Sequence, residues 1–213
     1  EIPTHASGPV KYDPVALSSE STVVAEWVPE TGSDTAYQSE GALEAELMHL
    51  LQEQAYAYLP ITTEAQLIAN LRTQLEALNG IRFSDGEWDR FFAERIASAN
   101  SGIEDKTIRI QEDHVQLLRR DDGTTKNVML IDKRHIHNNT LQVINQYEVA
   151  GGTDARPRAN RYDVTILVNG LPMVHVELKR RGVDIREAFN QINRYQRDSF
   201  WSGSGLFEYV QLF

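Results

Sequence analysis

Two carboxylates and one amine lie close together near the end of the chain, at Asp163, Glu177 and Lys179. Residues 162–168 and 173–179 alternate like strands, and Asn169-Gly170 between them is a strong hairpin signal. If Val168 pairs with Pro172 across a three-residue loop, Asp163 lies opposite Glu177. Two carboxylates at that separation suit Mg²⁺, which polarises a phosphodiester and activates an attacking water. Lys179 would orient that water or neutralise developing charge.

The two faces of this hairpin differ in chemistry. The even positions of the two strands are aliphatic and form a core face, whereas the odd positions carry the charged residues together with Thr165 and His175. The aliphatic positions are Val164, Ile166, Val168, Val174, Val176 and Leu178. An ordinary solvated sheet face with a cross-strand charge pair is the alternative, because Glu-x-Lys alone is a weak motif. Two opposed carboxylates favour a site, since like charges placed directly opposite each other destabilise a sheet.

A helix with an apolar stripe is predicted over residues 184–197, directly after the hairpin. Gln191 and Tyr195 lie one turn apart on it and both can point back toward the hairpin, although core packing is the default for Tyr195. Basic residues surround the helix and are candidates for phosphate contacts with DNA, with a solvated face as the alternative for each one. These candidates are Arg180, Arg181, Arg186 and Arg194.

The remaining elements indicate a mixed α/β fold. Ser39 is the predicted cap of a helix that runs to about Tyr58, and two more helices are predicted over 64–78 and 85–97. After Gly102 the pattern changes to strands. These are expected over 115–118, 128–131 and 141–147, with a further strand over 209–213. Residues 1–36 lack periodicity and predict an extended arm, which leaves 37–213 as the main domain.

The composition is that of a globular protein without disulfides. The chain has 213 residues, no cysteine and a net charge of −10, which favours a reducing cytoplasm. It also contains no apolar run long enough to span a membrane. The charge is uneven. Residues 1–60 hold ten acidic residues against the single basic Lys11, whereas 156–197 hold nine basic residues against four acidic ones. Because the chain starts with Glu and its last residues predict a strand with no turn after it, we expect it to be part of a longer protein.

Several runs of this sequence, in order, resemble the restriction (motor) subunit of type I restriction–modification enzymes. The runs are YQSE (37–40), LEAEL (43–47), LQVINQY (141–147), YDVTILVNGLP (162–172), VELK (176–179) and REAFNQINRY (186–195). The resemblance implies a PD-(D/E)xK, restriction-endonuclease-like core, which is a central mixed sheet flanked by helices, here with an added helical insertion. Tyr162 stands where the motif name has proline, a position that varies within the superfamily.

The resemblance also implies roles for individual residues. Asp163 and Glu177 match the metal ligands, with Mg²⁺ as the cofactor, and Lys179 matches the catalytic lysine. Gln191 and Tyr195 match a Gln-x-x-x-Tyr motif found in related nucleases. On the opening helix, Glu44 matches a glutamate of related resolvases, and Glu46 is the competing choice.

Partners follow from the same resemblance. The substrate would be double-stranded DNA, cut without base preference, in a complex with methyltransferase and specificity subunits. ATP would serve helicase motor domains expected beyond residue 213, because this chain contains no phosphate-binding loop of the GxxxxGK[ST] type. A repair nuclease or resolvase of the same superfamily, and a non-catalytic docking domain, are the alternatives. A zinc site at His135-x-His137 has no matching Cys or further paired His nearby.

Overall fold

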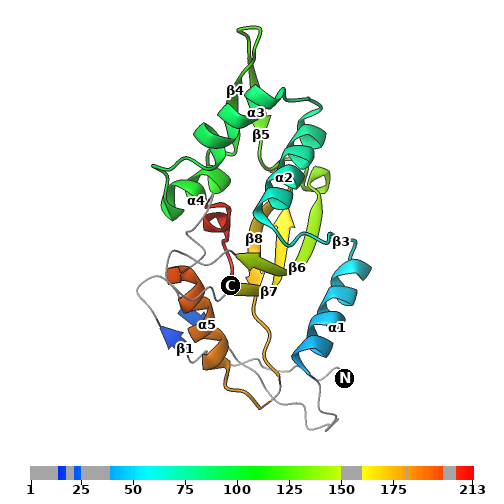
Figure 1. The fold of residues 1–213 in the computed structure, drawn as a ribbon, viewed down its shortest axis with the longest axis vertical. Helices are drawn as coiled ribbons and strands as arrows, with labels where there is room; N and C mark the ends of the chain where they lie inside the picture. The colour runs from blue at the N-terminus through cyan, green and yellow to red at the C-terminus, as the bar shows by residue number, and fades with distance from the viewer. Residues whose placement is uncertain (1–13, 18–21, 25–38, 150–159, 181, 199–204) are drawn as a thin grey trace, which may run out of the picture.

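The computed structural model describes residues 14–17, 22–24, 39–149, 160–180, 182–198 and 205–213 (Figure 1). Its centre is a four-stranded sheet in the order β3–β6–β7–β8. The strands are β3 (Ala57–Tyr58), β6 (Leu141–Val149), β7 (Asn160–Val168) and β8 (Leu171–Val176). β3 runs parallel to β6, and the other neighbours are antiparallel. The predicted mixed sheet is therefore confirmed.

Helices α1 (Glu40–Glu53) and α5 (Ile185–Asp198) cover opposite faces of this sheet. Met48 of α1 is buried in a cluster with Val143 and Val164. Tyr195 of α5 packs near His175, which pairs with Thr165, the residue after Val164. Because successive residues of a strand point to opposite faces, the two helices enclose the hairpin between them. The charged face of the hairpin is thus covered rather than solvated around Thr165 and His175, which are 1% and 0% exposed.

The insertion lies between β3 and β6 and occupies the upper part of Figure 1. It consists of α2 (Glu64–Asn79), α3 (Asp85–Phe91), the π-helical turn η1 (Phe92–Ile96), α4 (Ile103–Gln111) and the hairpin β4 (Val115–Arg119) and β5 (Thr125–Met129). Thr63 and Ser84 begin α2 and α3 with capping boxes, which satisfy amide groups that a helix start leaves without partners. The short 3-10 turn η2 (Ile136–Asn138) leads back to the sheet.

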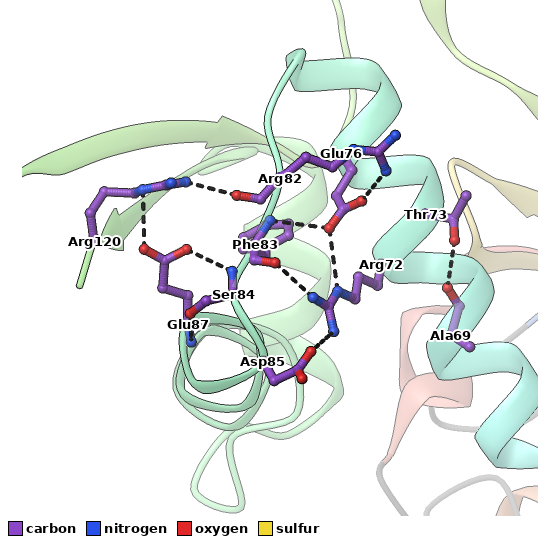
Figure 2. Close-up of polar contacts among 10 residues, drawn as sticks. All are labelled: Ala69, Arg72, Thr73, Glu76, Arg82, Phe83, Ser84, Asp85, Glu87 and Arg120. Carbon is purple, nitrogen blue, oxygen red and sulfur yellow. Dashed lines mark hydrogen bonds and ion pairs between the residues drawn. The ribbon is translucent and has the colours of Figure 1, made fainter. Parts of the chain in front are cut away.

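Two buried carboxylates join the parts of the insertion, as Figure 2 shows. Glu76 of α2 accepts hydrogen bonds from Arg72, Arg82 and the backbone amide of Phe83. Glu87 of α3 accepts from the amides of Ser84 and Asp121 and forms an ion pair with Arg120 at 3.1 Å. A buried carboxylate persists only when it is paired in this way, so the network fixes α2, α3 and β4 relative to one another.

The described end of the chain returns to the sheet. The 3-10 turn η3 (Leu206–Tyr209) is followed by Leu212, which makes a single parallel bridge to Val174 of β8. In the N-terminal arm, β1 (Pro14–Leu17) and β2 (Thr22–Val24) form an antiparallel pair. No helix among the described residues is long and apolar enough to cross a membrane.

Four local predictions are wrong, each for a physical reason. α1 ends at Glu53 instead of Tyr58, because Ala55 has a left-handed φ of 67° and β3 begins two residues later. α4 was not predicted, since four of its nine residues are charged and interrupt the apolar pattern. The predicted strand over 209–213 is reduced to the bridge at Leu212, because the 3-10 turn η3 extends to Tyr209. The loop of the β7–β8 hairpin has two residues instead of three.

Candidate active site

The β7–β8 turn fixes the register of the site. Asn169 and Gly170 both have positive φ, 50° and 83°, as a tight two-residue hairpin turn requires. Val168 therefore pairs with Leu171. An irregularity between Ile166 and Leu167 then shifts the pairing by one residue, so that Val164 lies opposite Val176. This is the pairing that the sequence predicts at the end of the hairpin where Asp163 lies.

The three predicted residues gather where β8 ends. Asp163 Oδ2 accepts a hydrogen bond of 2.9 Å from the backbone amide of Leu178, one residue beyond Glu177. Lys179 Nζ donates to Glu177 Oε1 at 2.8 Å and to the carbonyl of Leu178 at 3.2 Å. Asp163 thus lies on β7 and Glu177 directly after the last residue of β8, and the ammonium group of Lys179 pairs with the carboxylate of Glu177.

Burial perturbs the protonation of this group. Loss of solvent, reinforced by the nearby charge of Glu177, raises the pKa of Asp163 from 3.8 to about 6. Burial also opposes the charged form of Glu177, but the neighbouring His175 side chain and the hydrogen bond from Lys179 outweigh it and lower the pKa of Glu177. Burial of Lys179 is likewise outweighed by Glu177, which raises the pKa of this lysine. The site therefore holds Asp163, whose charged form is disfavoured by burial, beside the ion pair of Glu177 and Lys179.

The donor set fits a hard divalent cation. The side chain of Glu177 is fully buried, and its Oε2 has no hydrogen-bond partner among the described residues, with His175 Nε2 3.6 Å away. A buried carboxylate oxygen without a donor, next to a second carboxyl with a raised pKa, is the arrangement that a cation stabilises. Mg²⁺ needs only one or two carboxylates plus waters. Within the described part of the chain no group of three or more His, Cys, Asp or Glu is arranged around a common point.

Glu44 on α1 faces the sheet. It accepts hydrogen bonds from Asn145 Nδ2 at 2.6 Å and from Gln146 Nε2. Gln146 lies between the paired positions Asn145–Val164 and Tyr147–Tyr162, at the level of Asp163. Glu46, the competing choice, is exposed. Glu44 is therefore hydrogen-bonded to the strand next to β7.

Glu40, one helical turn before Glu44, is a residue that the sequence analysis missed. Its Oε1 accepts from the amide of Arg180 at 3.4 Å, and its charge contributes to the raised pKa of Lys179. The spacing of four from Glu44 on a capped helix was the available signal.

Gln191 and Tyr195 form a hydrogen-bonded pair on α5. Gln191 Nε2 donates to the Tyr195 hydroxyl, which donates to the carbonyl of Arg161 at 3.0 Å. Tyr195 is 2% exposed and packs on Tyr162, with ring centroids 4.9 Å apart. Burial, together with the charges of Glu177 and Asp163, raises the pKa of Tyr195. The pair therefore anchors α5 to β7 close to the carboxylates.

The predicted basic residues are spread out. Arg180, Arg186 and Arg194 are exposed, and the Arg194 guanidinium lies 5.5 Å from the ring centroid of Tyr195. Arg181 lies outside the described residues. The exposed positions beside the site are compatible with contacts to a polyanion.

The histidine pair considered for zinc differs from expectation. His135 directly precedes the 3-10 turn η2 and His137 lies within it, so the two do not share a strand face, and their ring centroids are 6.1 Å apart. His135 Nδ1 lies 3.6 Å from Asp132. Asp132 in turn accepts from the amides of Arg134 and His135 and from the Asn138 side chain. The carboxylate is thus used to hold the turn.

A family model described as "Type I restriction enzyme R protein N terminus" matches residues 37–213. The EcoprrI endonuclease subunit of Escherichia coli is 45% identical over 201 residues, 94% of this chain and 63% of the relative. The SsaAORF53P endonuclease subunit of Staphylococcus saprophyticus is 41% identical over 83% of this chain, and the SauMSSORF170P subunit of Staphylococcus aureus MSSA476 is 42% identical over 84%. The chain spans 18% of the length of each staphylococcal relative.

Proposed function

The chain belongs to the family of type I restriction enzyme R protein N termini, and we propose that the open end of its β7–β8 hairpin is the centre that cleaves double-stranded DNA in such an enzyme. One observation carries the proposal. Asp163 and Glu177 converge with Lys179 at a buried strand end, where the pKa of Asp163 is raised to about 6 and a Glu177 oxygen is left without a donor among the described residues. Perturbed titratable groups of this kind concentrate at functional sites.

Each residue has a distinct part in the proposed reaction. Asp163 and Glu177 are the groups that hold a divalent cation, which when bound supplies Lewis-acid stabilisation of the phosphodiester and a more acidic water. Lys179, kept protonated by its pairing with Glu177, neutralises charge that develops on the phosphate oxygens. Glu44 fixes Asn145 and Gln146 beside Asp163, and Tyr195 holds the backbone of β7 through Arg161.

The finer features of the proposal concern the cation, the substrate and the partners. Mg²⁺ is the proposed ion, because the carboxylate-only donor set suits a hard cation. The exposed arginines Arg180, Arg186 and Arg194 contact backbone phosphates, which carry no sequence information, so cleavage by this domain is without base preference. Methyltransferase and specificity subunits are the proposed partners, ATP acts on motor domains elsewhere in the protein, and the cytoplasm is the proposed location.

The test is cleavage by the full-length protein assembled with its partner subunits. We expect Lys179→Ala to lower Mg²⁺- and ATP-dependent cleavage of unmodified DNA by at least about 100-fold, the scale of losing one electrostatic group, while ATP hydrolysis stays near that of the wild type. The two rates are measured on the same preparation.

A matched control is Lys126→Ala, which removes an exposed lysine of β5 on the distant insertion hairpin. It should leave both rates unchanged. If cleavage survives Lys179→Ala, the hairpin charges are not catalytic and the domain is a docking module. If Lys179→Ala abolishes both cleavage and ATP hydrolysis, Lys179 supports the assembly of the enzyme and not the cleavage reaction.

A further inference from the structure

A second site of concentrated charge lies in the insertion, away from the hairpin. A pocket of about 240 Å³ is formed by α3, η1 and β4, several times the roughly 30 Å³ that one water occupies in the liquid. Four arginines line it: Arg90 of α3, Arg95 of η1, Arg119 at the end of β4 and Arg120 directly after β4. Four guanidinium groups around one hollow, in a chain with a net charge of −10, require an explanation.

Two of the four arginines are held in place by protein carboxylates. Arg120 pairs with buried Glu87 at 3.1 Å and donates to the carbonyl of Arg82 at 3.0 Å, as Figure 2 shows. Arg90 pairs with Asp121 at 2.6 Å. These contacts fix the directions of both side chains, so the wall of the pocket is organised before any ligand arrives.

The other two arginines lack such partners. Arg95 Nε is buried and has no hydrogen-bond partner among the described residues. Arg119 lines the same pocket and, among the described residues, makes no ion pair and no side-chain hydrogen bond. A buried donor without an acceptor destabilises a fold by about 1–3 kcal/mol. Arg95 also lies in the π-helical turn η1, a costly deviation from α-helix that is frequent at functional sites.

The charge balance of the lining identifies the missing acceptor as an anion. Arg120 is paired with Glu87 and Arg90 with Asp121, so that for Arg95 and Arg119 one carboxylate of the pocket lining remains, Glu94. We infer that this pocket binds a backbone phosphate of DNA, with Arg95 and Arg119 as the direct donors. The inference rests on the proposed function, which makes DNA the polyanion that the domain meets, and guanidinium forks match phosphate geometry. The insertion then holds the duplex while the hairpin cuts it.

The test is binding of a fluorescent random-sequence duplex by the full-length protein without its partner subunits, in chelator so that no cleavage occurs. We expect Arg95→Gln/Arg119→Gln to weaken binding roughly tenfold at moderate salt. The slope of log affinity against log salt should fall by about 1–2, one for each lost phosphate contact. Arg119→Gln alone, at an exposed strand position, should show part of both changes without any effect on folding. Arg134→Gln, an exposed arginine outside the pocket, should change neither.

Three outcomes would overturn the inference. The first is a double variant that binds with wild-type affinity and slope. The second is normal DNA binding together with lost assembly with the other subunits, which would mean that the pocket accepts a carboxylate of a protein partner. The third is a wild-type protein that does not bind the duplex. Failure of the proposed function looks different, because cleavage would then survive Lys179→Ala whatever the arginine variants do.

Discussion

At the scale of single residues, ionisation of Asp163 lowers the stability of the fold, whereas the proposed cation site requires the ionised carboxylate. Its folded-state pKa of about 6 lies above its ordinary value of 3.8, so the folded protein binds the proton more tightly than the unfolded chain does. Stability contributed by this proton is present at low pH and is lost as the pH rises from about 4 to about 6. The cation-free protein at neutral pH is therefore destabilised by ionised Asp163.

Asp163→Asn should accordingly stabilise the cation-free domain. The shift corresponds to about 1–3 kcal/mol at pH 7 after allowance for partial exposure, measured by urea unfolding in chelator. The gain should shrink to nothing as the pH falls to about 4, where the wild-type carboxyl is protonated in both states.

Glu177→Gln is the matched control for Asp163→Asn. The pKa of Glu177 is lowered in the folded state, so its charge stabilises the fold above its ordinary pKa, and the variant should be less stable at pH 7. Destabilisation by both variants would show that the two carboxyls are held by packing alone and that no charge conflict exists.

At the scale of elements, the hairpin turn connects the candidate site to the insertion. A Cβ added to Gly170 would lie 2.7 Å from Leu71 Cα in α2, and the backbone there has φ +83°. Gly170→Ala should therefore destabilise the protein by about 2–4 kcal/mol, from backbone strain plus the clash with a helix. Gly123→Ala has the same φ of +83° but no neighbour within 4 Å, and should cost only about 1 kcal/mol. Equal losses of unfolding free energy for the two variants, measured by urea unfolding, would show that the close approach of Gly170 to α2 does not affect stability.

What the sequence could predict also divides by element. The β7–β8 hairpin was predictable because alternation and Asn169-Gly170 are local signals, and the register near Val164 follows from them. The irregularity between Ile166 and Leu167 was not predictable, since it compensates a turn one residue shorter than expected. The position of Glu44 depends on contacts with Asn145 and Gln146 about a hundred residues away. Such contacts leave no local pattern, and the arginine pocket was missed for the same reason.

At the scale of the whole molecule, the insertion and the sheet are joined a second time near the described end of the chain. Lys106 of α4 is 2% exposed, donates to the carbonyl of Gly205 at 2.9 Å and pairs with Glu208 of η3. Beyond η3, the backbone at Gln211 and Leu212 bonds to Met173 of β8. The ion pair therefore connects the insertion, through η3, to β8, the strand that Glu177 directly follows.

This connection predicts a strong asymmetry between single and double substitutions. Lys106→Met leaves Glu208 and the Gly205 carbonyl without their donor in a buried place, and should lower the free energy of unfolding by about 3–5 kcal/mol. Adding Glu208→Gln removes the orphaned charge, so the double variant should recover a large part of that loss, because a buried pair contributes less in total than breaking it costs. Urea unfolding of the wild type, both single variants and the double variant gives the coupling energy directly. Additive losses would mean that the two charges do not depend on each other, and that η3 is held to α4 by the apolar packing of Leu206, Phe207 and Tyr209 alone.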